Sequence, residues 1–165
     1  MWLCADVDYR WDSAIAAGVL FLDWETSEAY EEIVERIDRV EEYVPGEFYR
    51  RELPCLLKLI MRTPEIEGVI IDGYVWLDEN LKAGLGGHLY EALDRKLPVV
   101  GVAKSRFTPA MPVSHEVYRG ESEKPLYVTT AGIDLKETAQ KVENMHGPYR
   151  NPTLLKLVDT LCRNS

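Results

Sequence analysis

Residues 68–104, GVIIDGYVWLDENLKAGLGGHLYEALDRKLPVVGVAK, decide the fold of this chain. The short apolar runs at 68–73 (GVIIDG) and 98–103 (PVVGVA) each have the length and composition of a buried strand. Between them, residues 84–97 (GLGGHLYEALDRKL) predict a helix that the chain enters through glycines. Strand, helix and strand in this order predict a right-handed unit with two parallel strands. The fold class is therefore α/β.

Two charged residues follow these two strands, Asp72 after the first and Lys104 after the second. Because parallel strands end at the same edge of a sheet, where open α/β sheets hold their binding sites, we expect the two side chains to lie close together. Each also has a simpler interpretation. Asp72 could merely end its strand, and Lys104 could be an ordinary surface lysine, so neither residue alone defines a site.

Sequence on the amino-terminal side of this unit predicts a hairpin. Residues 2–9 and 13–22 read as its strands and residues 10–12 as its turn. The first strand carries Asp6 between apolar neighbours, and a carboxylate there is costly to bury without a partner. Residues 28–44 fit two interpretations, because their apolar spacing and their glutamates favour a helix while a strand through 33–40 is also possible.

The remaining elements follow from local signals. Residues 52–62 predict an apolar helix with Pro54 in its first turn, where proline is tolerated. Residues 116–119 and 126–130 predict a second hairpin. Residues 134–144 predict a helix capped by Asp134, and residues 152–162 predict the last helix.

Length and composition predict a single domain, 1–165, with 46% hydrophobic residues to form its core. A net charge of −9 argues at first against a nucleic-acid partner. However, residues 23–52 hold 11 acids and 4 bases, whereas residues 95–165 hold 7 acids and 11 bases. A polyanion could therefore still bind the carboxyl-terminal part, with weak long-range attraction.

The cysteines and histidines are scattered along the chain. Cys4, Cys55 and Cys162 form no closely spaced pair, which favours buried, reduced thiols over a disulfide framework or a zinc site. No apolar run is long enough to cross a bilayer, and no basic leader is seen. We therefore expect a cytoplasmic monomer that has no contact with membranes.

The stretch 43–54, YVPGEFYRRELP, joins a turn to the start of the helix at 52–62. Pro45 and Gly46 supply a rigid bend and a residue free to take positive φ, so the turn can present Tyr43 outward. Glu52 then follows two arginines. The alternative is an ordinary surface turn before a helix, with Glu52 favoured there by the helix dipole.

Asp6, Glu52 and Asp72 come from three elements that a mixed sheet would bring together. Three hard oxygen ligands suit Mg²⁺ or Mn²⁺ better than zinc. Such an ion activates water and stabilises charge on a phosphoryl oxygen. A lysine at position 104 would add a fixed positive charge for the same transition state.

In their order and spacing, several motifs resemble the endonuclease V family, the metal-dependent nucleases that act at inosine. The resemblance runs from Asp6 to about Cys162. Its motifs are ADVDY in the first strand, YVPGEFYRREL, VIIDG, GLGGHL and VVGVAKSRF, followed by YRGESEKPLYVTTAG and YRNPTLLKLVD. No single motif is decisive, but together they are specific.

The resemblance implies a ribonuclease H-like mixed central sheet flanked by helices. It further implies cleavage of the second phosphodiester bond 3′ to inosine or deoxyinosine, in DNA or RNA, during repair or processing, leaving 3′-hydroxyl and 5′-phosphate ends. Such a sheet needs a third strand between Asp23 and Tyr43, so residues 30–40 are predicted as strand.

The resemblance also assigns roles to residues. Asp6, Glu52 and Asp72 would bind Mg²⁺ or Mn²⁺, Lys104 would lie at the scissile phosphate, and Asp159 would complete the catalytic site. A wedge would part the strand or stack against it, and a pocket would hold the extruded base, read partly by backbone amides. The wedge comprises Tyr43, Val44, Pro45 and Gly46; the pocket comprises Gly46, Phe48, Gly73, Gly84, Leu85, Ala103 and Phe107.

One stretch departs from the family pattern. Where the family has Gly followed by His-Pro-Arg, this chain has DGYVWLDENLKAG, with Asp78 near the family's histidine and Asn80 and Leu81 in place of its basic pair. Two alternatives therefore stay open beside the inosine-directed nuclease. One is a nucleic-acid-binding module on the same fold without catalysis, and the other is a nuclease of this fold with a substrate lacking inosine.

Overall fold

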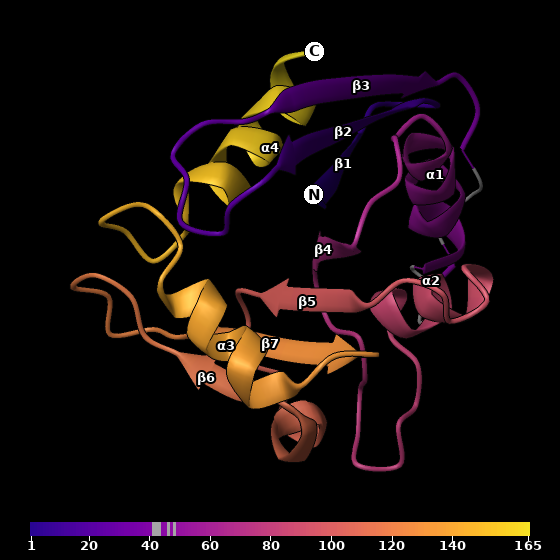
Figure 1. Ribbon diagram of the computed structural model, residues 1–165. Coiled ribbons are helices and arrows are strands. Elements are labelled where there is room, and N and C mark those ends of the chain that lie inside the picture. Colours follow the sequence, from indigo (N-terminus) through magenta and orange to yellow (C-terminus); the bar gives the residue numbers. More distant parts are fainter. Residues whose placement is uncertain (41–43, 46, 48) are drawn as a thin grey trace.

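One mixed β-sheet runs through the computed structural model, which describes residues 1–40, 44–45, 47 and 49–165 (Figure 1). The described strands lie in the order β3-β2-β1-β4-β5-β7-β6. β1 pairs in parallel with β4, and β4 with β5, whereas the other neighbours are antiparallel. Their bounds are β1 Trp2–Tyr9, β2 Ala14–Phe21, β3 Glu31–Ile37, β4 Gly68–Asp72, β5 Val99–Ala103, β6 His115–Val117 and β7 Leu126–Ala131.

The predicted strand–helix–strand unit is confirmed as β4, α2 and β5. Helix α2, Leu85–Ala92, ends earlier than predicted. Asp94 and Arg95 adopt left-handed backbone angles, with φ of 54° and 58°. Residues in that conformation leave the right-handed helical path, so the polar end of the predicted helix becomes a turn leading to β5.

The amino-terminal hairpin and the third strand are also confirmed. β1 and β2 pair from Trp2↔Phe21 to Tyr9↔Ala14. β2 is buried along its whole length, so its far edge needs a hydrogen-bonded neighbour. β3 supplies it by pairing antiparallel with β2. This tertiary pairing overrides the helical spacing of residues 28–44.

Helix α1, Tyr49–Met61, begins three residues before the predicted start. The prediction that Pro54 lies in the first turn is therefore wrong, because Pro54 falls in the second turn. The ring lies on the exposed side of the helix, away from the sheet. The opposite side carries a buried stripe at helical spacing, consisting of Glu52, Cys55, Leu56 and Leu59.

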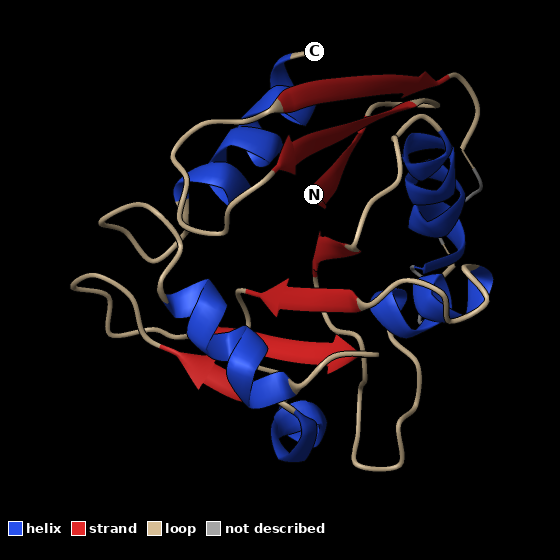
Figure 2. Cartoon of the chain, viewed as in Figure 1, coloured by secondary structure: helices blue, strands red, loops and turns tan. Residues whose placement is uncertain are grey.

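Helices cover both faces of the sheet (Figures 1 and 2). On one face, α1 and α2 pack over Leu3, Ala5 and other buried side chains. On the other face, α3, Leu135–Glu143, and α4, Thr153–Asn164, pack over a second cluster that includes Trp2 and Cys4. Because side chains alternate along a strand, the Asp6 side chain points to the same face of the sheet as those of Trp2 and Cys4, the face that α4 covers.

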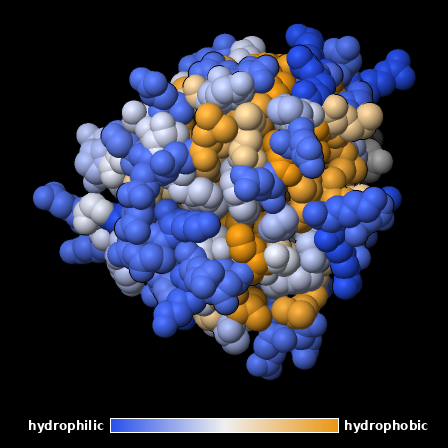
Figure 3. Space-filling view, viewed as in Figure 1, coloured by the Kyte–Doolittle hydropathy of each residue, from blue (hydrophilic) through white to orange (hydrophobic). Residues whose placement is uncertain are grey.

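The second predicted hairpin is confirmed as β6 and β7. The Asp134 cap is confirmed as well, since its Oδ2 accepts a hydrogen bond of 2.9 Å from the Glu137 amide. A 3₁₀ helix at Thr108–Val113 was not predicted. The face seen in Figure 3 carries mostly hydrophilic side chains with smaller apolar areas between them. Within the described residues, no helix combines the length and apolar character needed to cross a membrane.

Candidate active site

Four of the carboxylates expected at the site line one hollow in the structure. We call it the acidic hollow. The pairing of Ala5 with Ile71 places Asp6 and Asp72 side by side on adjacent parallel strands. Glu52 approaches from α1 and Asp159 from α4. The residues that line the hollow are Asp6, Val7, Asp8, Tyr9, Glu52, Asp72, Asp159, Cys162 and Arg163.

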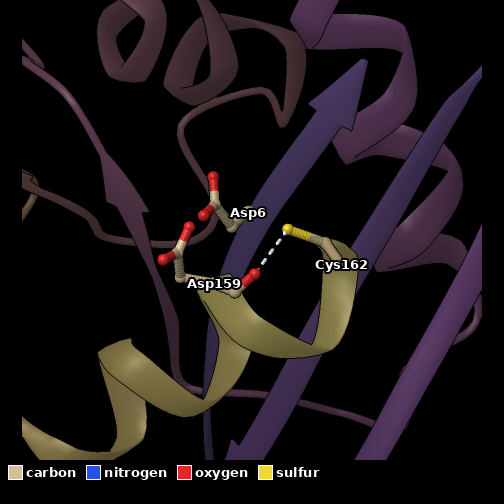
Figure 4. Close-up of side chains that lie close together, drawn as sticks. All are labelled: Asp6, Asp159 and Cys162. Carbon is tan, nitrogen blue, oxygen red and sulfur yellow. Dashed lines mark hydrogen bonds between the residues drawn. The ribbon is translucent and has the colours of Figure 1, made fainter. Parts of the chain in front are cut away.

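Strand and helix periodicity explain how Asp6 meets α4. Leu154, Val158 and Cys162 recur every four residues and bury one side of α4. Asp159 and Cys162 therefore reach the same part of β1 as Asp6, and Figure 4 shows the three side chains gathered between the strand and the helix. One ligand atom from each lies within 4.8 Å of the other two.

Glu52 occupies the most enclosed position of the four carboxylates. Its residue is 7% exposed, and its Oε2 has no hydrogen-bond partner among the described residues. Burial, followed by the charges of Asp6 and Asp72, raises its pKa to about 8. The helical stripe of α1 explains this placement, because Glu52 is its first member and faces the sheet.

The two strand carboxylates are perturbed in the same direction. Burial, followed by the charge of Asp72, raises the pKa of Asp6 to about 7, although the Val7 amide donates a hydrogen bond of 2.9 Å to its Oδ1. Burial also raises the pKa of Asp72, against the opposing effect of Lys104. Burial is the main cause in each case, and the neighbouring negative charges add to it.

Lys104 lies where the parallel strands predicted it. Its Nζ is 3.8 Å from Oδ2 of Asp72, and both side chains are partly exposed.

Sequence reasoning missed Arg150, which contacts the backbone of Lys104. The guanidinium of Arg150 donates hydrogen bonds to the backbone carbonyls of Lys104 and Pro125, the latter at 2.6 Å. Arg150 therefore ties the loop before α4 to the end of β5.

The donor set of the acidic hollow fits a hard divalent cation. Five carboxylates line it, those of Asp6, Asp8, Glu52, Asp72 and Asp159, and one buried Glu52 oxygen has no hydrogen bond from the described residues. Mg²⁺ and Mn²⁺ prefer oxygen ligands of this kind. Cys162 fits them poorly, because burial raises the pKa of its thiol to about 12 and its Sγ already donates to the Asp159 carbonyl at 3.2 Å (Figure 4).

A second hollow adjoins the first, and Asp72 lines both. We call it the glycine-lined hollow. It contains three of the predicted base-pocket residues, Gly73, Gly84 and Leu85. The other residues that line it are Glu47, Tyr49, Asp72, Tyr74, Leu77, Lys82, Ala83 and His88.

The other predicted substrate-binding residues are placed differently. Tyr43, Gly46 and Phe48 lie outside the described residues. Val44 and Pro45 are exposed. Ala103 is buried at the end of β5 and does not line the glycine-lined hollow. Phe107 is also absent from its wall and lies beside it, with its ring centroid 6.1 Å from that of Tyr74.

Tyr49 and His88 form an aromatic wall that sequence reasoning missed. Their rings stack with centroids 3.6 Å apart and planes 16° from parallel. The two residues are far apart in sequence and come from α1 and α2, which pack against each other. A flat, partly exposed aromatic pair beside a hollow suits contact with another flat group.

The stretch that departs from the family pattern forms a hairpin packed on the start of α2. Trp76 pairs with Ala83, and the Leu77 amide donates to the Lys82 carbonyl at 2.8 Å. Asp78 Oδ1 accepts hydrogen bonds from the backbone amides of Asn80 and Lys82, so this carboxylate stabilises the hairpin tip.

Glycines allow this hairpin to approach α2. Gly73, at the point where the chain leaves β4 for the hairpin, has φ of +130°, a conformation that favours glycine. A Cβ on Gly84 would lie 2.6 Å from the Tyr74 carbonyl oxygen. The amides of Gly84 and Gly87 donate to the carbonyl of Val75, so they are already engaged within the protein.

Comparison with known proteins gives consistent matches. The Endonuclease V family model matches residues 3–141. A curated endonuclease V of Streptomyces avermitilis is 29% identical over 143 residues, covering 74% of this chain and 61% of the relative. A second curated endonuclease V, from Streptomyces coelicolor, is 29% identical over 141 residues, and the match covers 59% of that relative. The chain thus spans about three fifths of the length of these relatives.

Solved structures share the fold. The crystal structure of the S. avermitilis endonuclease V superposes with a TM-score of 0.78 and 26% identity, covering 98% of this chain and 79% of that one. Endonuclease V of Ciona intestinalis, in complex with a DNA containing an inosine followed by a ribo-adenosine, gives a TM-score of 0.79 at 16% identity, covering 99% and 83%. The predicted ribonuclease H-like sheet is confirmed by these superpositions.

Proposed function

Because this chain belongs to the endonuclease V family, we propose that it is a metal-dependent endonuclease that acts on nucleic acid containing inosine. The bond it cleaves is the second phosphodiester 3′ to the inosine. The observation that carries the proposal is the convergence of Asp6, Glu52, Asp72 and Asp159 on one hollow with Lys104 beside it. Carboxylates that raise one another's pKa are costly unless a cation is bound among them.

Asp6, Glu52 and Asp72 would hold Mg²⁺ or Mn²⁺, with Asp159 completing the site. A bound ion would supply Lewis acidity that activates water and neutralises charge on a phosphoryl oxygen. The enclosed position of Glu52 keeps its carboxylate fixed and largely free of competing solvent. This rigidity favours catalysis, because a preorganised site needs little rearrangement as the reaction proceeds.

Lys104 would neutralise the scissile phosphate. Its Nζ lies 3.8 Å from Asp72 Oδ2, and both side chains are partly exposed, so a phosphate can approach them. Arg150 holds the Lys104 backbone through its carbonyl, which limits the positions that the ammonium group can take. Charge placed in advance where negative charge develops is the largest single contribution in many enzymes.

The glycine-lined hollow would receive the inosine base. Its position next to Asp72 puts a bound base close to the cleaved backbone. The Tyr49–His88 pair offers it a flat wall. The complex of the Ciona relative with inosine-containing DNA supports this choice of base. The cost of unstacking an inosine is small where its pairing is already weak, which favours recognition by extrusion.

Cleavage of matched inosine-containing and plain oligonucleotides, in both DNA and RNA, tests this function. Each would be incubated with Mg²⁺, Mn²⁺ or EDTA and with wild type, Asp6→Asn or Asp94→Asn. Asp94 is an exposed turn residue with φ of 54°, a conformation that asparagine also tolerates, so it provides a matched control. We expect metal-dependent cuts at the second phosphodiester bond, lost in Asp6→Asn and kept in Asp94→Asn.

The altered hairpin at residues 74–83 supports one second candidate, a nuclease of this fold that does not require inosine. This hairpin lines the glycine-lined hollow through Tyr74, Leu77 and Lys82, and it carries Asn80 and Leu81 where the family pattern has a basic pair. Metal-dependent cuts that ignore inosine would favour this candidate. Inosine-selective binding without cleavage by wild type in any metal would refute catalysis and favour a binding module.

A further inference from the structure

The turn between β1 and β2 projects beyond the acidic hollow. β1 continues past Asp6, and its next three residues, Val7, Asp8 and Tyr9, all line the hollow. Trp11 follows two residues later, in the turn that leads to β2. At about 3.3 Å per residue, the five residues from Asp6 to Trp11 span at most about 17 Å. Trp11 therefore lies near the rim of the candidate site.

Several hydrogen bonds hold this turn in place. The Arg10 amide donates to the Ser13 carbonyl at 2.8 Å, and Arg10 Nε donates to Asp8 Oδ2 at 2.8 Å. Arg10 Nη2 also donates to three backbone carbonyls at the end of α4, those of Cys162, Arg163 and Ser165. Because both β1 and the end of α4 line the acidic hollow, these bonds fix the turn relative to the site.

Trp11 itself is fully exposed, at 100%. The other three tryptophans, all within the described residues, have structural roles. Trp2 is 7% exposed and packs edge-on against Trp24 with ring centroids 5.0 Å apart, and Trp76 donates from its indole nitrogen to the Thr130 carbonyl. Within the part of the chain that the structure describes, the Trp11 indole is not packed into the fold, although exposing so large an apolar ring is unfavourable.

We propose that Trp11 is a stacking platform for a nucleobase of the substrate strand outside the cleaved position. Aromatic side chains beside a backbone-binding site bind bases of any sequence, because every base has a flat face. At about 3.4 Å per stacked nucleotide, the reach of about 17 Å places this base within about five nucleotides of the phosphate at the acidic hollow. This inference rests on the proposed function.

The charge of the protein favours such a contact. A net charge of −9 gives little long-range attraction for a polyanion, so short-range stacking must supply part of the binding energy. The Arg10 guanidinium adjoins Trp11 in sequence and pairs with Asp8, and the Arg163 guanidinium, which lines the hollow, pairs with Asp159. Because the nearby cations already have carboxylate partners, the uncharged indole is the group at this turn that can attract a base without competing for them.

Binding and cleavage by Trp11→Ala and Trp11→Phe test the proposal. Tyr30→Ala provides the control, because Tyr30 is also an exposed aromatic residue, at 61%, and lies outside both hollows. Binding would be measured in EDTA with a single-stranded inosine oligonucleotide, by titration and by quenching of tryptophan fluorescence. We expect Trp11→Ala to weaken binding about 5- to 100-fold, with most affinity kept by Trp11→Phe and all by Tyr30→Ala.

A set of oligonucleotides with one abasic position locates the stacked base. Wild type should lose affinity when the base that meets Trp11 is missing, and Trp11→Ala should be insensitive at that same position. In cleavage assays, the variant should raise KM with little change in kcat. Fluorescence quenching by the oligonucleotide should fall strongly in Trp11→Phe, because Trp11 is the fully exposed tryptophan and Trp2, Trp24 and Trp76 are buried or partly buried.

Unchanged affinity and quenching in the Trp11 variants would overturn the inference while leaving the nuclease intact. Loss of self-association in Trp11→Ala, with oligonucleotide binding unchanged, would also overturn it and assign the turn to contact between copies of the chain. Because binding is measured in EDTA, a protein that binds but never cleaves would refute the proposed function and still test Trp11.

Discussion

Replacing Glu52 by glutamine removes the carboxyl group most deeply buried in the acidic hollow and keeps its shape. Burial and the charges of Asp6 and Asp72 raise the pKa of Glu52 from 4.5 to about 8 in the folded protein without metal. The folded state therefore retains a proton that the unfolded chain releases. The stabilisation from this proton is complete below the unfolded pKa and is lost as the pH rises toward the folded pKa.

The magnitude follows from the size of the shift. One pKa unit corresponds to about 1.4 kcal/mol, so titration of Glu52 between about pH 5 and about pH 8 removes about 3–4 kcal/mol from the free energy of unfolding. For a protein of this size, the loss corresponds to about 6–15 °C in Tm. Glu52→Gln cannot titrate and should lack this part of the pH dependence.

Thermal unfolding in EDTA across this pH range measures the effect. Wild type and Glu65→Gln, an exposed control, should lose Tm steeply. Glu52→Gln should lose less, and the pH dependence that it keeps comes from Asp6 and Asp72, whose pKa values are also raised. Mg²⁺ added near pH 8 should raise the Tm of wild type more than that of Glu52→Gln, because a cation offsets the charge that burial disfavours. Equal pH dependence of Tm in wild type and Glu52→Gln would refute the raised pKa of Glu52.

Four further predictions address the surrounding structure. Lys104→Ala should lower kcat about 10²- to 10³-fold in single-turnover cleavage with little change in Tm, and an unchanged rate would remove this residue from the reaction. Arg150→Ala should lower the free energy of unfolding by about 1–3 kcal/mol and should also lower the cleavage rate, because Arg150 ties the Lys104 carbonyl to the loop before α4. Arg150→Lys should restore little of either, because a lysine cannot reproduce the planar, several-donor geometry of the guanidinium. Gly84→Ala should destabilise the protein by about 1–3 kcal/mol in urea, since its Cβ would lie 2.6 Å from the Tyr74 carbonyl oxygen, and an unshifted midpoint would show that the hairpin moves freely. The three cysteines are buried, and burial raises the pKa of both Cys4 and Cys162 to about 12. A disulfide reagent near pH 8 should therefore label these thiols only after the protein unfolds. Rapid labelling of the native protein would contradict the packing of α4 on β1.

Local patterns predicted the elements whose signals lie within a few residues. The apolar runs of β4 and β5 and the glycines before α2 define the parallel unit, and the geometry of such a unit predicts that Asp72 lies beside Lys104, as the structure shows. The cap at Asp134 and the two hairpins depend on equally short-range signals.

Elements that depend on distant partners have weak local signals. Residues 28–44 carry helical spacing, so β3 was predicted from the family resemblance and not from local periodicity, and its pairing with β2 confirms it. The start of α1 and the position of Pro54 were wrong for a similar reason, because packing on the sheet extends the helix beyond its local signal. The Tyr49–His88 stack joins two helices and has no signature in either segment.

The sequence by itself determined an α/β chain with carboxylates on three separate elements and a lysine after the fifth strand. Only the tertiary structure decided that Glu52 is buried with an oxygen that receives no hydrogen bond from the described residues. It also decided how close Asp159 of α4 lies to Asp6 of β1, and that Arg150 reaches the Lys104 carbonyl. The physical reason is the distance along the sequence over which each effect acts. Periodicity and turn chemistry act between near neighbours, whereas burial and the pKa of a carboxyl group depend on what the folded chain brings from far along the sequence.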